Sequence, residues 1–188
     1  MIALVRWLPA VLVVLSTGAC ATVVAPQATP APAAAPDAGP VVPVAHGTRN
    51  VYVTFYGGPD NDPPGSTDIA YPNGRHGTAG GVGTDADPIT LATDPRELPP
   101  GTLVYVPRLK KYFVMEDDCE DCIAEWGANR RPHVDLWTAA AGARLPACEE
   151  ALTPDAPVPL EINPPADRPV DPRPLYDPAA DRCLSGGP

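Results

Sequence analysis

Basic side chains are scarce in this sequence. The chain has 13 lysines and arginines against 23 aspartates and glutamates, which gives a formal net charge of −10. Nucleic-acid sites need clustered Lys and Arg to neutralise phosphates, so this composition argues against nucleic-acid binding. The same charge disfavours adhesion to anionic wall polymers or lipid headgroups, and it leaves neutral or zwitterionic glycans as plausible partners.

A hydrophobic run long enough to cross a membrane is also missing. The apolar stretch at residues 8–15 is too short to span a bilayer as a helix. It follows Arg6 and precedes small residues, so residues 1–20 are predicted to be a bacterial signal peptide. We favour lipid attachment at Cys20 over simple cleavage beside it. Either outcome places the protein in the cell envelope, secreted or lipid-anchored, with membrane contact only through such an anchor.

The cysteines form no complete zinc motif. Without Cys20 four remain, which allows three pairings, and an oxidising compartment permits disulfides. We favour Cys119 with Cys122 and Cys148 with Cys183. Half a zinc site or a redox pair is the alternative for Cys119 and Cys122, but the chain has no second pair at matching spacing and no thioredoxin-like context. We therefore expect two disulfides, no metal site and no cofactor.

Prolines divide the chain into segments. Residues 21–49 are rich in Ala and Pro and are predicted to be a disordered linker. Prolines recur from Thr153 onward, so residues 151–188 are predicted to be an extension without central strands, tied back by Cys183. Residues 50–150 remain as the folded domain, which we expect to be monomeric.

Short alternating or β-branched runs dominate the folded part. They predict strands at residues 51–56, 89–92, 103–106, 112–116 and 133–137. A short helix is plausible at residues 147–152. No helices of crossover length alternate with the strands, so we expect a mainly β fold with little helix, a small disulfide-stabilised barrel of five or six strands.

The densest chemistry lies in residues 112–122. An apolar strand, Tyr112 to Met115, leads directly into Glu116, Asp117 and Asp118. Carboxylates at the rim of a core lose hydration, which raises their pKa and suits them to general acid catalysis. The following segment, up to Cys122, is predicted to be a disulfide-linked acidic loop.

The order of several segments is similar to that of a known family. Residues 92–95, 98–107, 114–117 and 133–137 together resemble the three-aspartate (3D) domain. That domain is a double-psi β barrel of cell-wall lytic transglycosylases, related to rare lipoprotein A proteins, expansins and barwin-like domains. The resemblance covers residues 54–137 and implies a six-stranded double-psi barrel. It carries the family's three acids onto Asp94, Asp117 and Asp135.

The resemblance also implies a function, which is to cleave or bind peptidoglycan or another wall polysaccharide. A lytic transglycosylase uses one acid to protonate the glycosidic oxygen. The resulting carboxylate then takes a proton from the sugar's 6-hydroxyl as a 1,6-anhydro ring closes. We assign this acid to Asp117, with Asp94 and Asp135 as supports. The alternatives are a non-catalytic, expansin-like glycan-binding or wall-loosening module, and a barrel whose acids serve only the fold.

Four further residues are candidates for substrate binding. Tyr56 and Trp126 lie next to predicted loops, and aromatic faces can stack on sugar rings. His76 lies in a glycine-rich loop. His133 shares a strand face with Asp135, where it would be either a second proton carrier or a structural histidine.

Overall fold

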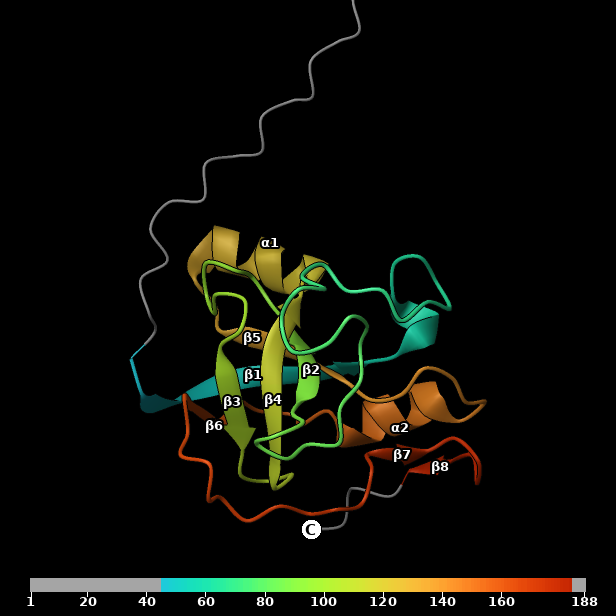
Figure 1. The fold of residues 1–188 in the computed structure, drawn as a ribbon. Coiled ribbons are helices and arrows are strands. Elements are labelled where there is room, and N and C mark those ends of the chain that lie inside the picture. Colours follow the sequence, from blue (N-terminus) through green and yellow to red (C-terminus); the bar gives the residue numbers. More distant parts are fainter. Residues whose placement is uncertain (1–44, 184–188) are drawn as a thin grey trace, which may run out of the picture. The chain divides into compact units, whose positions relative to one another are not determined.

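Residues 45–183 are described by a computed structural model, in which strands run around a closed barrel (Figure 1). The barrel strands are β1 (Gly47–Tyr56), β2 (Ile89–Ala92), β3 (Leu103–Val106), β4 (Lys111–Asp117), β5 (His133–Trp137) and β6 (Val158–Ile162). The remaining elements are the 3-10 helix η1 (Gly58–Asp60), the helices α1 (Glu120–Asn129) and α2 (Leu145–Leu152), and a small sheet of β7 (Tyr176–Asp177) and β8 (Arg182–Cys183).

The strand order around the barrel is β1-β5-β2-β4-β3-β6. β1 runs parallel to β5, and β2 runs parallel to β4. The other neighbours are antiparallel. Parallel neighbours cannot be joined by a tight hairpin, so long connections must cross the barrel ends. The connection from β4 to β5, which are separated by β2 in the barrel, contains α1, and Figure 1 shows this helix lying across one end of the barrel.

The core fills the barrel with aliphatic and aromatic side chains. β2 and β4 are buried along their whole length, which agrees with the mostly apolar sequence of β2 and with the apolar run from Tyr112 to Met115 in β4. Charged residues stand at both ends of β4, and at its start the buried ammonium group of Lys111 donates to the carbonyl oxygens of Val82 and Asp171. These backbone acceptors satisfy the buried amine and attach the C-terminal extension to the barrel.

The fold class predicted from the sequence is confirmed. The domain is a mainly β, six-stranded closed barrel with two helices and two disulfides. β2, β3 and β5 have the bounds that the sequence predicted, and α2 starts two residues before the predicted helix. β1 begins at Gly47, so the end of the predicted linker belongs to the barrel. The predicted signal peptide, Cys20 and the rest of the linker lie outside the described residues.

The prediction that the segment after Thr153 supplies no central strand is wrong. β6 closes the barrel by pairing with both β1 and β3. Its proline, Pro159, is exposed and lies opposite Asn50 of β1, whereas the pairing with β3 involves only Glu161 and Ile162. Pro159 therefore occupies a stretch that is paired on one side, where a missing N–H is tolerated.

The prediction of a loop after Asp117 is also wrong, because α1 begins at Glu120. The sulfur of Cys119 caps the helix by accepting a hydrogen bond from the Cys122 N–H at 3.1 Å. Glu120 and Asp121 in the first turn favour the positive end of the helix dipole. The helix ends where Arg130 adopts a left-handed conformation with φ of 59°.

Both predicted disulfide pairings are present. Cys119 pairs with Cys122 at the start of α1, and Cys148 of α2 pairs with Cys183 of β8. The first bond fixes the helix end beside β4. The second joins residues 35 positions apart and holds the extension against the barrel. In residues 45–183, no helix is long and apolar enough to cross a membrane.

Removing the longer disulfide should lower stability strongly. The double variant Cys148→Ser/Cys183→Ser frees a loop whose ends are 35 residues apart. The chain-entropy relation then gives a loss of about 3–4 kcal/mol in the free energy of unfolding. Urea unfolding followed by tryptophan fluorescence measures this loss. The matched variant Cys119→Ser/Cys122→Ser opens a much shorter loop and should lose less.

Candidate active site

A groove of about 720 Å³ is lined by barrel strands and by the first turn of α1. Its walls come from β1, β2, the ends of β4 and β5, the first turn of α1 and the loop at residues 60–70. The lining residues are Thr54, Tyr56, Asp60, Asn61, Asp62, Asp68, Ile69, Ala70, Ala92, Asp117, Asp118, Cys119, Glu120, Asp121, Ile123, His133 and Asp135. Two of the three predicted acids, Asp117 and Asp135, therefore share one groove.

Strand register explains how these two acids meet. Ala92 of β2 is paired with Asp117 on β4 and with Asp135 on β5. A shift in register between Leu91 and Ala92 brings Asp117 opposite Ala92. The acids therefore flank one small residue, with their Cα atoms roughly two strand spacings, or about 10 Å, apart. The methyl side chain of Ala92 leaves the space between them open.

Asp117 is held as a well-supported carboxylate at the end of β4. It accepts hydrogen bonds from the Tyr56 hydroxyl at 2.9 Å, the Ala70 N–H at 2.9 Å and the Asp118 N–H at 3.0 Å. Burial raises its pKa above the usual value, and these three donors act in the opposite direction. Its oxygens are fixed in position by groups from three separate segments.

Asp135 has less support and a larger pKa shift. Its carboxyl accepts one side-chain hydrogen bond, from the Thr54 hydroxyl at 2.8 Å. Burial is the main cause that raises its pKa to about 7, and the negative charges of Asp60 and Asp121 act in the same direction. Asp135 therefore keeps a proton at mildly acidic pH while it lines the groove, which is the condition a general acid needs.

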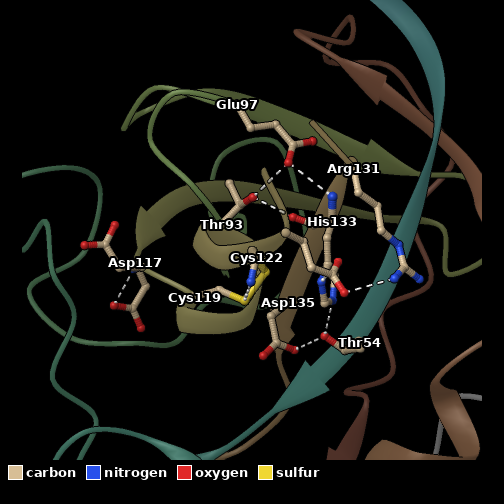
Figure 2. Close-up of a disulfide and its surroundings, with 11 residues drawn as sticks. Thr54, Thr93, Glu97, Asp117, Cys119, Cys122, Arg131, His133 and Asp135 are labelled. Atoms are coloured by element: carbon tan, nitrogen blue, oxygen red, sulfur yellow. Dashed lines mark hydrogen bonds and ion pairs between the residues drawn. A yellow bond between two sulfur atoms is a disulfide. The ribbon is translucent and has the colours of Figure 1, made fainter. Parts of the chain in front are cut away.

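A row of polar contacts extends from Asp135 toward α1 (Figure 2). The Thr54 hydroxyl lies 3.0 Å from Nε2 of His133. Nδ1 of His133 lies 3.0 Å from Oε2 of Glu125, whose other oxygen accepts from Arg131 at 3.0 Å. The backbone of His133 is also bonded, because its N–H donates to the buried carboxyl of Glu97 and the His133 carbonyl oxygen accepts from the Thr93 hydroxyl. Hydrogen bonds therefore fix both the ring and the backbone of His133.

The third predicted acid, Asp94, lies outside the groove. Its side chain is completely buried and forms an ion pair with Arg96, whose backbone N–H also donates to it at 2.7 Å. Burial works to raise its pKa, but the hydrogen bonds and charge of Arg96 outweigh burial and lower it. Asp94 thus closes the turn after β2 and has no access to a ligand in the groove.

His76 also lies away from the groove lining. Its ring bonds Glu116 at 2.7 Å and Asp87 at 3.1 Å. Burial alone would lower its pKa, but these two carboxylates raise it. Within the same glycine-rich loop, Gly81 has φ of +95°, and a Cβ there would lie 2.0 Å from the Pro88 carbonyl oxygen. The loop is therefore packed on the barrel, with His76 as one of its attachments.

The two predicted aromatic candidates differ. Tyr56 lines the groove, but it is only 7% exposed, and its ring packs edge-on against Trp137 with 5.2 Å between centroids. Trp126 lies on α1 outside the groove lining, where Arg130 stacks over its ring at 5.4 Å. Neither ring therefore offers an open face on which a sugar could stack in the groove. The fourth predicted binding residue, His133, does line the groove.

Acidic side chains dominate the rest of the groove rim. Besides the two central acids, the lining contains Asp60, Asp62, Asp68, Asp118, Glu120 and Asp121. His133 is the one side chain of the lining that can carry positive charge. Such a surface repels anionic ligands and tolerates neutral or cationic ones. Among residues 45–183, no group of three or more His, Cys, Asp or Glu side chains is arranged to hold a metal ion.

Sequence reasoning missed Thr54, Ala92 and Glu125. Thr54 and Ala92 matter only through pairing with distant strands, and a single sequence does not state strand order. Glu125 was missed because a loop was predicted after Asp117, whereas this residue lies on helix α1. The sequence did hold a signal for the helix, because Glu120 and Asp121 are acids suited to a first turn.

Comparison with known proteins places the chain in a family. Residues 48–184, which include the barrel except for its first residue, Gly47, match the family described as the DDB_G0273701 N-terminal domain. The chain belongs to this family. A relative in Dictyostelium discoideum, called uncharacterized protein DDB_G0273701/DDB_G0273221, is 48% identical over 103 residues, which are 54% of this chain and 45% of that protein. No solved structure matches.

Proposed function

We propose that this barrel cleaves a neutral or zwitterionic wall glycan, with peptidoglycan as the first candidate, in an envelope or secreted setting. The observation that carries the proposal is the placement of Asp117 and Asp135 on either side of Ala92 in one groove. Their environments differ, since one carboxyl has three hydrogen-bond donors and the other has a pKa raised to about 7. Paired carboxyls with separated protonation behaviour are the usual equipment for glycosidic cleavage.

In this proposal the acid is Asp135, whereas the sequence resemblance pointed to Asp117. Protonated Asp135 donates its proton to the glycosidic oxygen, and the bond from C1 to that oxygen breaks. The carboxylate of Asp117 stabilises the positive charge that develops at C1. The sugar's 6-hydroxyl then attacks C1 and gives its proton to Asp135, which restores the acid and leaves a 1,6-anhydro end. The resemblance to lytic transglycosylase domains supports this choice over attack by water.

Replacing Asp117 by Asn should slow cleavage without removing the acid. Asn keeps the size of the side chain. Its amide oxygen can still accept from the Ala70 N–H, and its NH2 group can donate to the Tyr56 hydroxyl oxygen, so the fold should survive. Loss of the negative charge opposite C1 should lower kcat by roughly 100-fold. The measurement is release of soluble saccharide from insoluble peptidoglycan. Asp68→Asn, on the same groove but at its rim, should change the rate little.

A non-catalytic glycan-binding module is the second candidate. The observation in its favour is that Asp117 already has three protein donors, as a structural carboxylate would. This candidate predicts that the protein sediments with insoluble glycan but releases no soluble saccharide. It also predicts that Asp117→Asn and Asp135→Asn bind glycan as the wild type does. Cleavage by the wild type would eliminate it.

A further inference from the structure

The contacts from Asp135 to Glu125 limit where protons can lie. Glu125 forms an ion pair with Arg131, so its other oxygen faces the His133 ring as a carboxylate acceptor at 3.0 Å. Nδ1 of His133 must therefore carry hydrogen. At the opposite ring nitrogen, Nε2 meets the Thr54 hydroxyl, which has only one hydrogen to share between His133 and Asp135.

Two arrangements satisfy every one of these contacts when Asp135 and Nε2 of His133 hold one proton between them. In the first, Asp135 is protonated and donates to Thr54, whose hydrogen is donated to Nε2 of a neutral His133. In the second, Thr54 donates to the Asp135 carboxylate and accepts from Nε2 of a protonated His133. The second is obtained from the first when Asp135 passes a proton to Thr54 and Thr54 passes its own to Nε2. Each arrangement holds a single proton more than the fully deprotonated pair.

We propose that His133 and Glu125 are positioning residues that control the proton of Asp135 through the hydroxyl of Thr54. Glu125 fixes the ring tautomer, so neutral His133 draws the Thr54 hydrogen away from Asp135 and favours the protonated acid. After Asp135 has given up its proton, Thr54 turns its hydrogen to the new carboxylate. Nε2 is then left without a hydrogen to accept, until a proton returns to the pair.

The surrounding charges act on the same carboxyl from every side. Asp60 from η1 and Asp121 from α1 raise its pKa, after burial as the largest cause. Tyr56 from β1 and Asp117 from β4 line the same groove, and Arg131 lies behind Glu125. Removing any nearby negative charge therefore shifts the pKa of Asp135. The test needs a control variant that removes such a charge without changing the contacts of Thr54.

The test is NMR titration of the full chain, with the Asp135 carboxyl carbon and the His133 ring nitrogens observed together. In the wild type, the Nε2 signal should move with the same midpoint as the Asp135 carboxyl. Thr54→Val should separate the two midpoints, and Thr54→Ser should keep them together. Glu125→Gln should lower the Asp135 midpoint by roughly one pH unit, because an amide permits the other ring tautomer. Glu120 is an exposed acid on the same helix and lines the groove, so Glu120→Gln controls for the lost negative charge. This variant should shift the Asp135 midpoint clearly less than Glu125→Gln does.

Independent midpoints in the wild type would overturn the inference. Equal shifts in Glu125→Gln and Glu120→Gln would also overturn it, and this comparison decides the matter if Thr54→Val does not fold. The inference concerns the acid of the proposed function and depends on that function for its catalytic meaning. The titration needs no substrate, so a protein with coupled signals but no cleavage would contradict the proposed function alone.

Discussion

Asp135→Asn is expected to reduce saccharide release from peptidoglycan by about 100- to 10,000-fold while leaving the barrel folded. Asn has no proton to give, and the other groove acid, Asp117, is held by three donors as a carboxylate. General acid catalysis alone contributes about 100- to 10,000-fold, so the loss should lie within that range. The measurement is the rate at which reducing or anhydro sugar ends appear in solution.

The pH dependence gives this prediction a control. Burial raises the pKa of Asp135 to about 7, so wild-type activity should fall as pH rises through that value. The sign for stability follows from the same shift. The folded protein binds this proton more tightly than the unfolded chain, so Asp135 costs stability increasingly as pH rises from about 4 toward 7. Asp135→Asn should therefore melt at a temperature no lower than wild type at pH 8. A melting point several degrees lower there would show that Asp135 serves the fold.

Leu160→Ala should have the largest effect on stability among single changes in β6. Leu160 is completely buried in the core, on the strand that closes the barrel between β1 and β3. Truncating a fully buried leucine costs about 2–5 kcal/mol of unfolding free energy, because apolar contacts are lost and a cavity remains. Urea unfolding followed by far-UV circular dichroism measures the change.

The neighbouring proline supplies the matched control. Pro159 precedes Leu160 on the same strand but is exposed, so Pro159→Ala should change the unfolding free energy by less than about 1 kcal/mol. If Leu160→Ala were as mild as Pro159→Ala, β6 would be a surface attachment and not a wall of the barrel.

Sequence patterns predicted the barrel well where local signals and the fold agree. β2 and β3 consist of apolar or β-branched side chains, and β5 alternates buried Val134 and Leu136 with the residues of its other face, so the limits of these strands were predictable. The disulfide pairing of Cys148 with Cys183 was also correct. β6 was missed because Pro159 argues against a strand unless the pairing on each side is known. That pairing depends on the path of the whole chain.

The site was half predictable for a related reason. Asp117 and Asp135 stand at the end of one strand and inside another, and the sequence marked both. Asp94 looked equivalent, yet Arg96 two residues later turns it into a buried ion pair. The roles of Thr54 and Ala92 arise from contacts between strands distant in sequence. Such roles follow only from strand order.

Mass spectrometry of the soluble products from insoluble peptidoglycan tests the central proposal most directly. The purified protein should release fragments with 1,6-anhydro ends, lighter by one water than hydrolysis products, and Asp135→Asn should release them at least about 100-fold more slowly under the same conditions. If the wild-type protein binds the glycan but releases no soluble fragment at any pH between 5 and 7, the groove is not a catalytic site for this polymer. Equal release by wild type and Asp135→Asn would contradict the assignment of the acid.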